Sequence, residues 1–360
     1  MNLTFETYEW PFSEETLGRI EDILRTEKVF SFFDRNEDPY KAILFRRQHN
    51  FHDTRAIALF DQNVLNDVIS LVRDPVEGID RPCNSRGRFG AALMAFLQAA
   101  NVDIEPGVAV HEKKQTALRD LQLLRCADNV DAVVYARIAL GEKDRIPVSA
   151  LPTLPPIEEH LDFSKNIAGR QVYRVALLKI AQLELSQLSS EAKMAEFLRW
   201  SFEEFCIARI PVLLACMYLS PQRQSPMIGS LRSCDRSRAI AGIENALWDV
   251  QLIARWSEKV TTQKTDRCLW LLCSRDKAVH AIARVICHVG ATPDELSREI
   301  QRIFISHWGK RHGNEFAATL VDYETRVAEP TRFHNRDRSL KRLSWLEQDL
   351  EEALVTWRPR

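Results

Sequence analysis

Short apolar runs that end on acidic residues are the clearest pattern in this chain. Residues 55–61 read Arg-Ala-Ile-Ala-Leu-Phe-Asp, residues 101–105 read Asn-Val-Asp-Ile-Glu, and residues 267–276 end on Cys-Ser-Arg-Asp. Short, nearly uninterrupted apolar runs are typical of strands that are buried on both faces of a parallel sheet. Apolar residues at helical spacing follow each run, so we predict a strand, an acidic turn and a helix at each place.

Most of the remaining chain shows helical periodicity. Ser13 is placed to cap a helix that begins with acidic residues, and the segment from Pro106 to Leu140 is predicted to be one long helix. Prolines at 147–156 and 221–226 mark breaks. We predict a mainly helical α/β protein with an N-terminal helical cap at 1–52, the first half of an α/β core at 53–145, a helical insertion at 146–232, the second half of the core at 233–290 and a C-terminal helical region at 291–360.

Composition narrows the choice of partners and location. The chain has 49 basic and 50 acidic residues and a formal net charge of -1, so a nucleic-acid surface would have to be a local patch. The eight cysteines form no C-x-x-C pair and are predicted to be reduced thiols. The apolar run at 205–219 contains Arg209 and Pro211 and is shorter than the roughly 20 residues of a membrane span. With no leader-like segment at its start, we expect a cytoplasmic protein without a membrane partner.

Asp61 and Asp276 both follow predicted strands, and parallel strands have their carboxyl ends at one edge of the sheet. Carboxylates gathered there repel each other and lose hydration unless a cation joins them. Mg²⁺ and Mn²⁺ prefer oxygen ligands, and such an ion can activate water and hold a phosphodiester oxygen. The sequence therefore predicts a divalent-ion site, with Glu105 as a further ligand or as a charge at the start of a helix.

Each acid also has a local interpretation that the sequence leaves open. Asp61 and Asp276 are placed to cap the helices that follow them. Glu112 fits a solvated helix position, and Asp249 can pair with Arg255.

Four short segments resemble the motifs of PIN-domain nucleases. They are Asp61-Gln-Asn-Val-Leu, Pro106-Gly-Val-Ala-Val-His-Glu112, Asn245-Ala-Leu-Trp-Asp249 and Leu271-Leu-Cys-Ser274-Arg-Asp276. The resemblance covers residues 55–130 and 235–290. It implies a PIN-like parallel-sheet core in which Asp61, Glu112, Asp249 and Asp276 are catalytic and bind Mg²⁺ or Mn²⁺. Gln62 departs from the Thr or Ser that is usual after the first Asp, and the long gap between the second and third motifs makes the intervening helices an insertion.

The resemblance implies a metal-dependent endoribonuclease that hydrolyses RNA phosphodiester bonds. By analogy, it suggests a toxin or phage-defence effector with a protein regulator or defence partner, and a homo-oligomer is compatible with it. The candidate substrate-binding residues are Asn63 and Ser274 in the motifs, and Arg236, Arg238, Arg336 and Arg338 in basic clusters.

Two alternatives from other classes stay open. One is a catalytically inactive PIN-like scaffold that works through its helical insertion. The other is an all-helical, metal-independent HEPN-type ribonuclease, whose R-x-x-x-x-H motif occurs at 47–52, 275–280 and 302–307.

Overall fold

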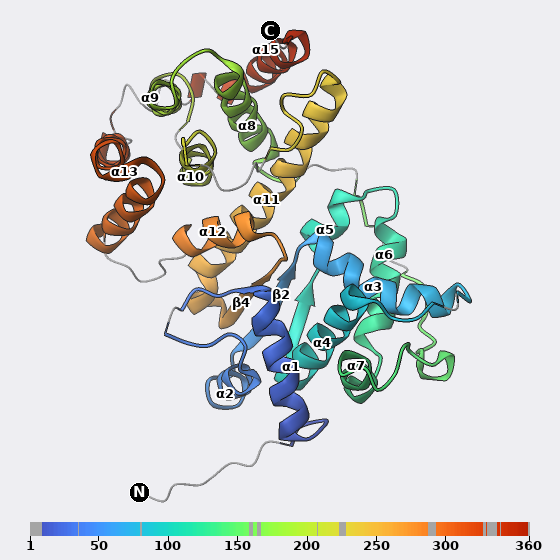
Figure 1. The fold of residues 1–360 in the computed structure, drawn as a ribbon. Coiled ribbons are helices and arrows are strands. Elements are labelled where there is room, and N and C mark those ends of the chain that lie inside the picture. The colour runs from blue at the N-terminus through green and yellow to red at the C-terminus, as the bar shows by residue number, and fades with distance from the viewer. Residues whose placement is uncertain are drawn as a thin grey trace, which may run out of the picture. The chain divides into compact units, whose positions relative to one another are not determined.

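The computed structural model divides into two compact units, each of which we describe by itself (Figure 1). The α/β unit comprises residues 1–165 and 258–276, and the helical unit comprises residues 166–257 and 277–360. The structure describes residues 9–34, 36–79, 81–157, 161–163, 167–206, 208–222, 228–286, 293–326, 329, 337–338 and 340–358.

The α/β unit contains the strands and the helices around them. Its strands are β1 (Phe30–Ser31), β2 (Arg55–Phe60), β3 (Val102–Glu105) and β4 (Cys268–Cys273). Its helices are α1 (Glu14–Glu27), α2 (Ala42–His52), α3 (Gln62–Val76), α4 (Ser85–Ala100), α5 (Gly107–Glu112), α6 (Ala117–Asp128), α7 (Ala132–Ala139) and the short 3₁₀ helix η1 (Val148–Ala150).

The four strands form one sheet in the order β1-β4-β2-β3. β2 lies in parallel between β3 and β4, so that Ala58 is opposite Ile104 on one side and Leu271 on the other. These are the three strands that the sequence predicts. β1 pairs antiparallel with the outer side of β4, which makes the sheet mixed and corrects the prediction of a wholly parallel one. A strand of two residues carries no periodic signal, and residues 1–52 were therefore expected to be helical only.

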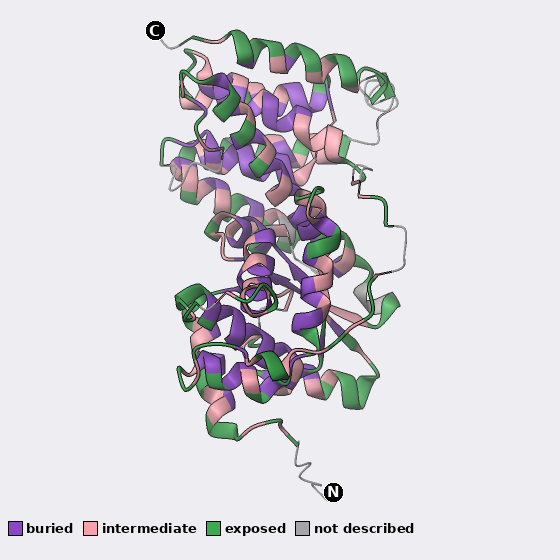
Figure 2. Cartoon of the chain, turned by 90° about the vertical axis from the view of Figure 1, so that its right-hand side faces the viewer, coloured by how far each residue is buried: buried purple, intermediate pink, exposed green. Residues whose placement is uncertain are grey.

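α4 anchors the layer of helices that positions β2 and α3. Most of its residues are buried, and α3, α1 and α7 pack against it (Figures 1 and 2). Gly90 lets α3 approach closely, because a Cβ atom at that position would lie 2.7 Å from the backbone oxygen of Asp67. Any larger residue would therefore displace α3, whose first turn carries the predicted site.

The helical predictions hold at the start of the unit and fail in its middle. Ser13 caps α1 as expected, accepting a hydrogen bond from the backbone N–H of Thr16 at 3.2 Å. The single long helix expected after Pro106 is wrong, because the chain forms α5, α6 and α7 there. Asp131 begins α7 by accepting from the N–H of Val133 at 2.7 Å, and this cap competes with helix continuation.

The helical unit contains α8 (Arg170–Leu185), α9 (Ser190–Glu203), α10 (Arg209–Tyr218), α12 (Lys277–Ile286), α13 (Pro293–Thr325) and α15 (Leu343–Thr356). α11 (Arg236–Asp266) begins in this unit, and its residues from Glu258 onward belong to the α/β unit. α10 is the buried helix expected from the apolar run at 205–219. Within the described ranges, no helix is both long enough and apolar enough to cross a membrane.

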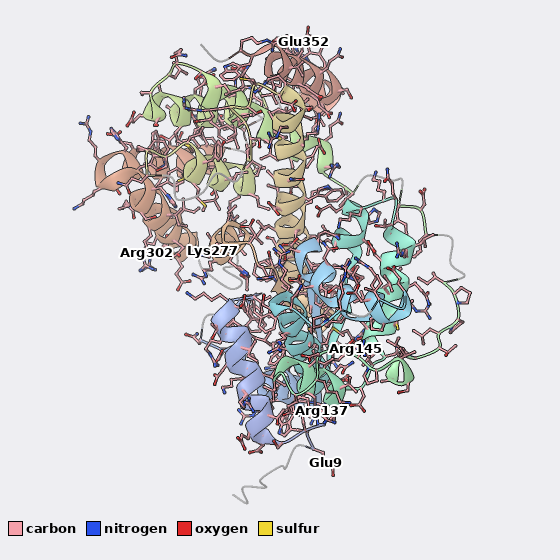
Figure 3. The ribbon with its side chains drawn as sticks, turned by 45° about the vertical axis from the view of Figure 1, so that its right-hand side comes forward. Glu9, Arg137, Arg145, Lys277, Arg302 and Glu352 are labelled. Atoms are coloured by element: carbon pink, nitrogen blue, oxygen red, sulfur yellow. The ribbon has the colours of Figure 1, made fainter. Side chains whose placement is uncertain are left out.

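Buried arginines join the helices of this unit. α15 packs on α8 through Leu350 and Leu354, while Glu352 of the same helix is exposed (Figure 3). Arg174 of α8 forms ion pairs with Glu347 and Glu351 of α15, and with Glu244 of α11. The helix faces are thus held by charge as well as by apolar contact.

Candidate functional site

The candidate site lies in the α/β unit at the carboxyl ends of β2 and β4. The chain passes from β2 to β3 on one side and then returns to β4 on the other side of β2. Strand order therefore changes direction beside β2, and open α/β sheets bind ligands outside the strand ends at such a point. The backbone pairing continues one residue past the strand, where the N–H of Asp61 donates to the carbonyl of Cys273 at 2.9 Å.

Asp61 is buried, with 8% of its surface exposed, directly before α3. It occupies the N-cap position, but its side chain makes no capping hydrogen bond. Its Oδ2 instead accepts from the hydroxyl of Ser274 at 2.5 Å and from the side-chain amide of Asn63 at 2.6 Å. The capping interpretation of this carboxylate is therefore wrong, and the side chain belongs to a polar network between two turns.

Ser274 and Asn63 connect the turn after β2 to the turn after β4. The Oγ of Ser274 donates to Asp61 and accepts from the backbone N–H of Asp276 at 3.0 Å. The Oδ1 of Asn63 accepts from the backbone N–H of Arg275 at 3.2 Å. These bonds bring together four residues that the sequence singled out, namely Asp61, Asn63, Ser274 and Asp276.

The electrostatics of Asp61 disfavour its charged form. Burial raises its pKa, and the nearby charge of Asp276 raises it further, while hydrogen bonds from Ser274, the Gln62 N–H and Asn63 act in the opposite direction. Among the described residues, no Lys, Arg or His forms an ion pair with this carboxylate. A buried acid with neutral donors and a second acid beside it is the arrangement that a bound cation would stabilise.

Arg275 faces away from this network and fixes the turn after β4. Its Nη1 donates to Oδ2 of buried Asp67 at 2.8 Å, and its Nη2 lies 3.6 Å from Oε2 of Glu27. Its guanidinium also lies 5.1 Å from the centre of the Phe89 ring. Arg275 thus holds α1, α3 and α4 to the turn that carries Asp276. The sequence left the role of Arg275 open and missed Asp67, whose signal is an acid on the apolar face of α3.

The other predicted acids are placed differently. Glu105 accepts from the N–H of Gly107 at 2.7 Å. This hydrogen bond agrees with its interpretation as a charge at the start of a helix. Glu112 is the half-buried last residue of α5, and Asp249 lies on α11 in the helical unit. Over the described part of the chain, no three His, Cys, Asp or Glu side chains are grouped closely enough to hold one ion.

Asp61 and Asp276 still offer a fit to a hard divalent ion. Mg²⁺ commonly takes one or two carboxylates from the protein and completes its shell with water and substrate phosphate. Gln62, next in sequence to Asp61, has a buried Oε1 with no hydrogen-bond partner among the described groups. Its Nε2 donates to Asn66 at 3.1 Å, which leaves the oxygen as the unused end. The donor set fits an oxygen-preferring cation.

The predicted substrate-binding arginines divide into three groups. Arg236 is buried and donates to the backbone carbonyls of Leu231, Ser233 and Leu354, which gives it a structural role in place of the predicted one. Arg238 and Arg338 are exposed in the helical unit. Arg336 lies outside the described residues.

Comparison with known proteins found nothing similar to this chain. The chain matches no protein-family model, no curated protein and no solved structure.

Proposed function

We propose that this protein is a metal-dependent phosphodiester hydrolase that cuts RNA, with its catalytic centre at Asp61 and Asp276. One observation supports the proposal most strongly. Asp61 is buried beside a second carboxylate at the strand switch point, and no cationic side chain among the described residues neutralises it. Perturbed acids in such positions are far more common at functional sites than elsewhere. The resemblance of the surrounding segments to PIN-domain motifs indicates RNA as the substrate.

The residues of the network have distinct roles in this proposal. Asp61 and Asp276 hold Mg²⁺ or Mn²⁺, which when bound activates water and neutralises charge on the phosphodiester. Ser274 fixes the orientation of the Asp61 carboxylate by donating to Oδ2. Asn63 keeps the two turns at a constant separation by bonding to both. Burial raises the pKa of Asp61, so a cation held by this carboxylate would compete with its proton.

The biological setting is proposed on resemblance alone. It suggests a cytoplasmic toxin or phage-defence effector that is controlled by a protein regulator and acts as a homo-oligomer. Glu112 and Asp249 would complete the acidic set that the resemblance implies.

RNA cleavage by the full chain tests the proposal directly. We expect cutting in Mn²⁺ or Mg²⁺, no cutting in EDTA, and a loss of at least about 100-fold in both Asp61→Asn and Asp276→Asn. Asp53→Asn is the matched control, because Asp53 is exposed and adopts a left-handed backbone conformation that Asn tolerates. Cutting that survives EDTA and both site variants would overturn the proposal.

A catalytically inactive scaffold is the second candidate. It is favoured by the lack of a third acid in the ion-binding group among the described residues. Thermal unfolding separates the two: Mn²⁺ should raise the melting temperature of the wild type and not of Asp61→Asn if the site binds the ion. A wild type that neither cuts RNA nor responds to Mn²⁺ would favour the scaffold. The HEPN motif at 275–280 receives no support, because the Arg275 side chain is bound to Asp67.

A further inference from the structure

A cavity of about 420 Å³ lies within the helical unit. α8, α9 and α15 form its walls together with Arg338, just before α15. Arg342 at the N-cap of α15 and residues of that helix line the cavity at helical spacing, the latter being Trp345, Leu346, Asp349 and Leu350. Its volume is within the range of small-molecule sites, which is about 300–1,000 Å³. The cavity is separate from the candidate catalytic centre, which belongs to the α/β unit.

Charged side chains of both signs line this cavity, namely Lys179, Arg338, Arg342, Glu203, Glu204 and Asp349. Glu203 and Glu204 line the cavity, but both form ion pairs with Arg199, at 2.9 and 2.8 Å. Neither Arg338 nor Arg342 forms an ion pair with any residue that the structure describes. Guanidinium groups without a carboxylate partner at the wall of a cavity are suited to bind an anion, and phosphate fits their planar donors best.

Lys179 provides a third donor deeper in the same cavity. Its Nζ bonds to Oε1 of Gln182 at 3.0 Å and lies 5.5 Å from the centre of the Trp200 ring. Burial lowers the pKa of this lysine, and the charges of Glu196, Glu204 and Asp349 oppose that shift.

An exposed tryptophan distinguishes this cavity from a simple anion site. Trp345 has 53% of its surface exposed, and the guanidinium of Arg342 lies 4.3 Å from its ring centre. Single-stranded nucleotides are bound by aromatic rings on which the base stacks and by arginines that hold the phosphate. Arg342 lies over one face of the Trp345 ring, so a base would stack on the other face. Gln182 and Asp349 supply hydrogen-bonding groups for the edge of a base.

We infer that this cavity binds a nucleotide, with the base stacked on Trp345 and the phosphate held by Arg338 and Arg342. The nucleotide is either free or part of a single-stranded RNA. The inference does not depend on the proposed cleavage at Asp61, because the site is built entirely from the helical unit.

Isothermal titration of the full chain in EDTA tests this inference. The probes are AMP, UMP, inorganic phosphate and a single-stranded oligonucleotide. We expect saturable binding of AMP or of the oligonucleotide, weakened about ten-fold in Trp345→Leu and about ten-fold in Arg342→Gln. Arg302→Gln on α13 should bind as the wild type does, because Arg302 is exposed like Arg342 but does not line the cavity (Figure 3).

The outcomes separate the sources of the ligand. Tighter binding of the oligonucleotide than of AMP assigns the site to RNA, and equal binding assigns it to a free nucleotide. Three results would overturn the inference: no saturable binding of any nucleotide probe, phosphate binding as tightly as AMP, or binding that is unchanged in both cavity variants.

Discussion

The two units surround their carboxylates with different partners. In the helical unit, Glu244 and Glu347 lie against Arg174, whose side chain is only 14% exposed, at distances of 2.6 and 2.5 Å. In the α/β unit, Asp61 is buried with neutral donors from Ser274 and Asn63, and its nearest charge is another acid. In the helical unit these carboxylates have a guanidinium partner, whereas in the α/β unit no cationic side chain among the described residues pairs with Asp61.

This difference indicates which polar group is structural and which is available for chemistry. A buried ion pair holds helices in register, and removal of one partner leaves the other uncompensated. A buried acid without a cation lowers the stability of the fold at neutral pH, so its presence is better explained by a ligand. Arg275 and Asp67 supply an internal contrast, because Asp67 has a guanidinium partner whereas Asp61 accepts its hydrogen bonds from Ser274 and Asn63.

The largest effect is expected where a buried arginine serves several acids. Arg174→Ala should lower the free energy of unfolding by about 3 kcal/mol, because Glu347 and Glu351 lose their guanidinium partner, while Glu244 keeps its ion pair with Arg170. Arg199→Ala is the matched control, since Arg199 also contacts three acids but is 43% exposed, and its loss should cost below about 1 kcal/mol. Urea unfolding measures both, and hydrogen exchange in α8 locates the effect. Equal losses would show that burial does not govern the difference.

An intermediate effect is expected for the pair that supports the site. Arg275→Ala should cost about 2 kcal/mol, because buried Asp67 loses the guanidinium that bonds to it and keeps only the more remote charge of Arg86. Arg275 already opposes the rise in the Asp67 pKa that burial causes, so the variant raises that pKa further and the loss should shrink as the pH falls. Unfolding at several pH values measures this. In the double variant with Asp67→Asn the cost should largely disappear, and an undiminished cost would assign the effect to the contact with Phe89.

A smaller effect is expected for the residue that connects the two turns. Asn63→Ala should cost about 1 kcal/mol, because Asp61 loses one donor and the Arg275 N–H loses its acceptor. Asn129→Ala, at an exposed position after α6, should cost less. Chemical denaturation of both variants checks the order, and the reverse order would show that the connection between the turns contributes little.

The smallest effect is expected at Asp61. At acidic pH, Asp61→Asn should change the free energy of unfolding least, and at neutral pH it should raise it where the other variants lower it. Because its pKa is raised in the folded state, the folded protein holds the proton more tightly than the unfolded chain does. Stability contributed by this group is therefore lost as the pH rises from about 4 through the raised pKa. Asp61→Asn has no such titration, so in EDTA its stability relative to the wild type should increase over that range. A difference that does not vary with pH would contradict the raised pKa.

Local patterns in the sequence predicted much of the α/β unit. The three apolar runs became β2, β3 and β4, and the acids after β2 and β4 met at one edge, because parallel strands align their ends. Strand β1 was missed because two residues form a strand only when an existing edge pairs with them. In place of the long helix predicted after Pro106, the chain forms α5, α6 and α7. Asp131, which caps α7, lies within the apolar pattern that suggested one helix.

The site was predicted in part for the same reason. Asp61, Asn63, Ser274 and Asp276 lie next to strands, so their approach follows from strand pairing. Arg236 was expected to bind substrate, and its burial against three carbonyls could not be read from a basic cluster, because charge patterns do not reveal which side chains a fold encloses. Asp249 fits its motif by sequence, but the motif does not specify that α11 begins in the helical unit.

The sequence by itself determined the elements whose signals are local, namely buried strands, capped helices and acidic turns, because the conformational preferences of a few neighbouring residues specify each of them. Only the tertiary structure decided which polar groups share a partner. The hydrogen bond from Ser274 to Asp61 joins residues 213 positions apart. The raised pKa of Asp61 comes from burial and from the charge of Asp276, and both act only once the strands have paired.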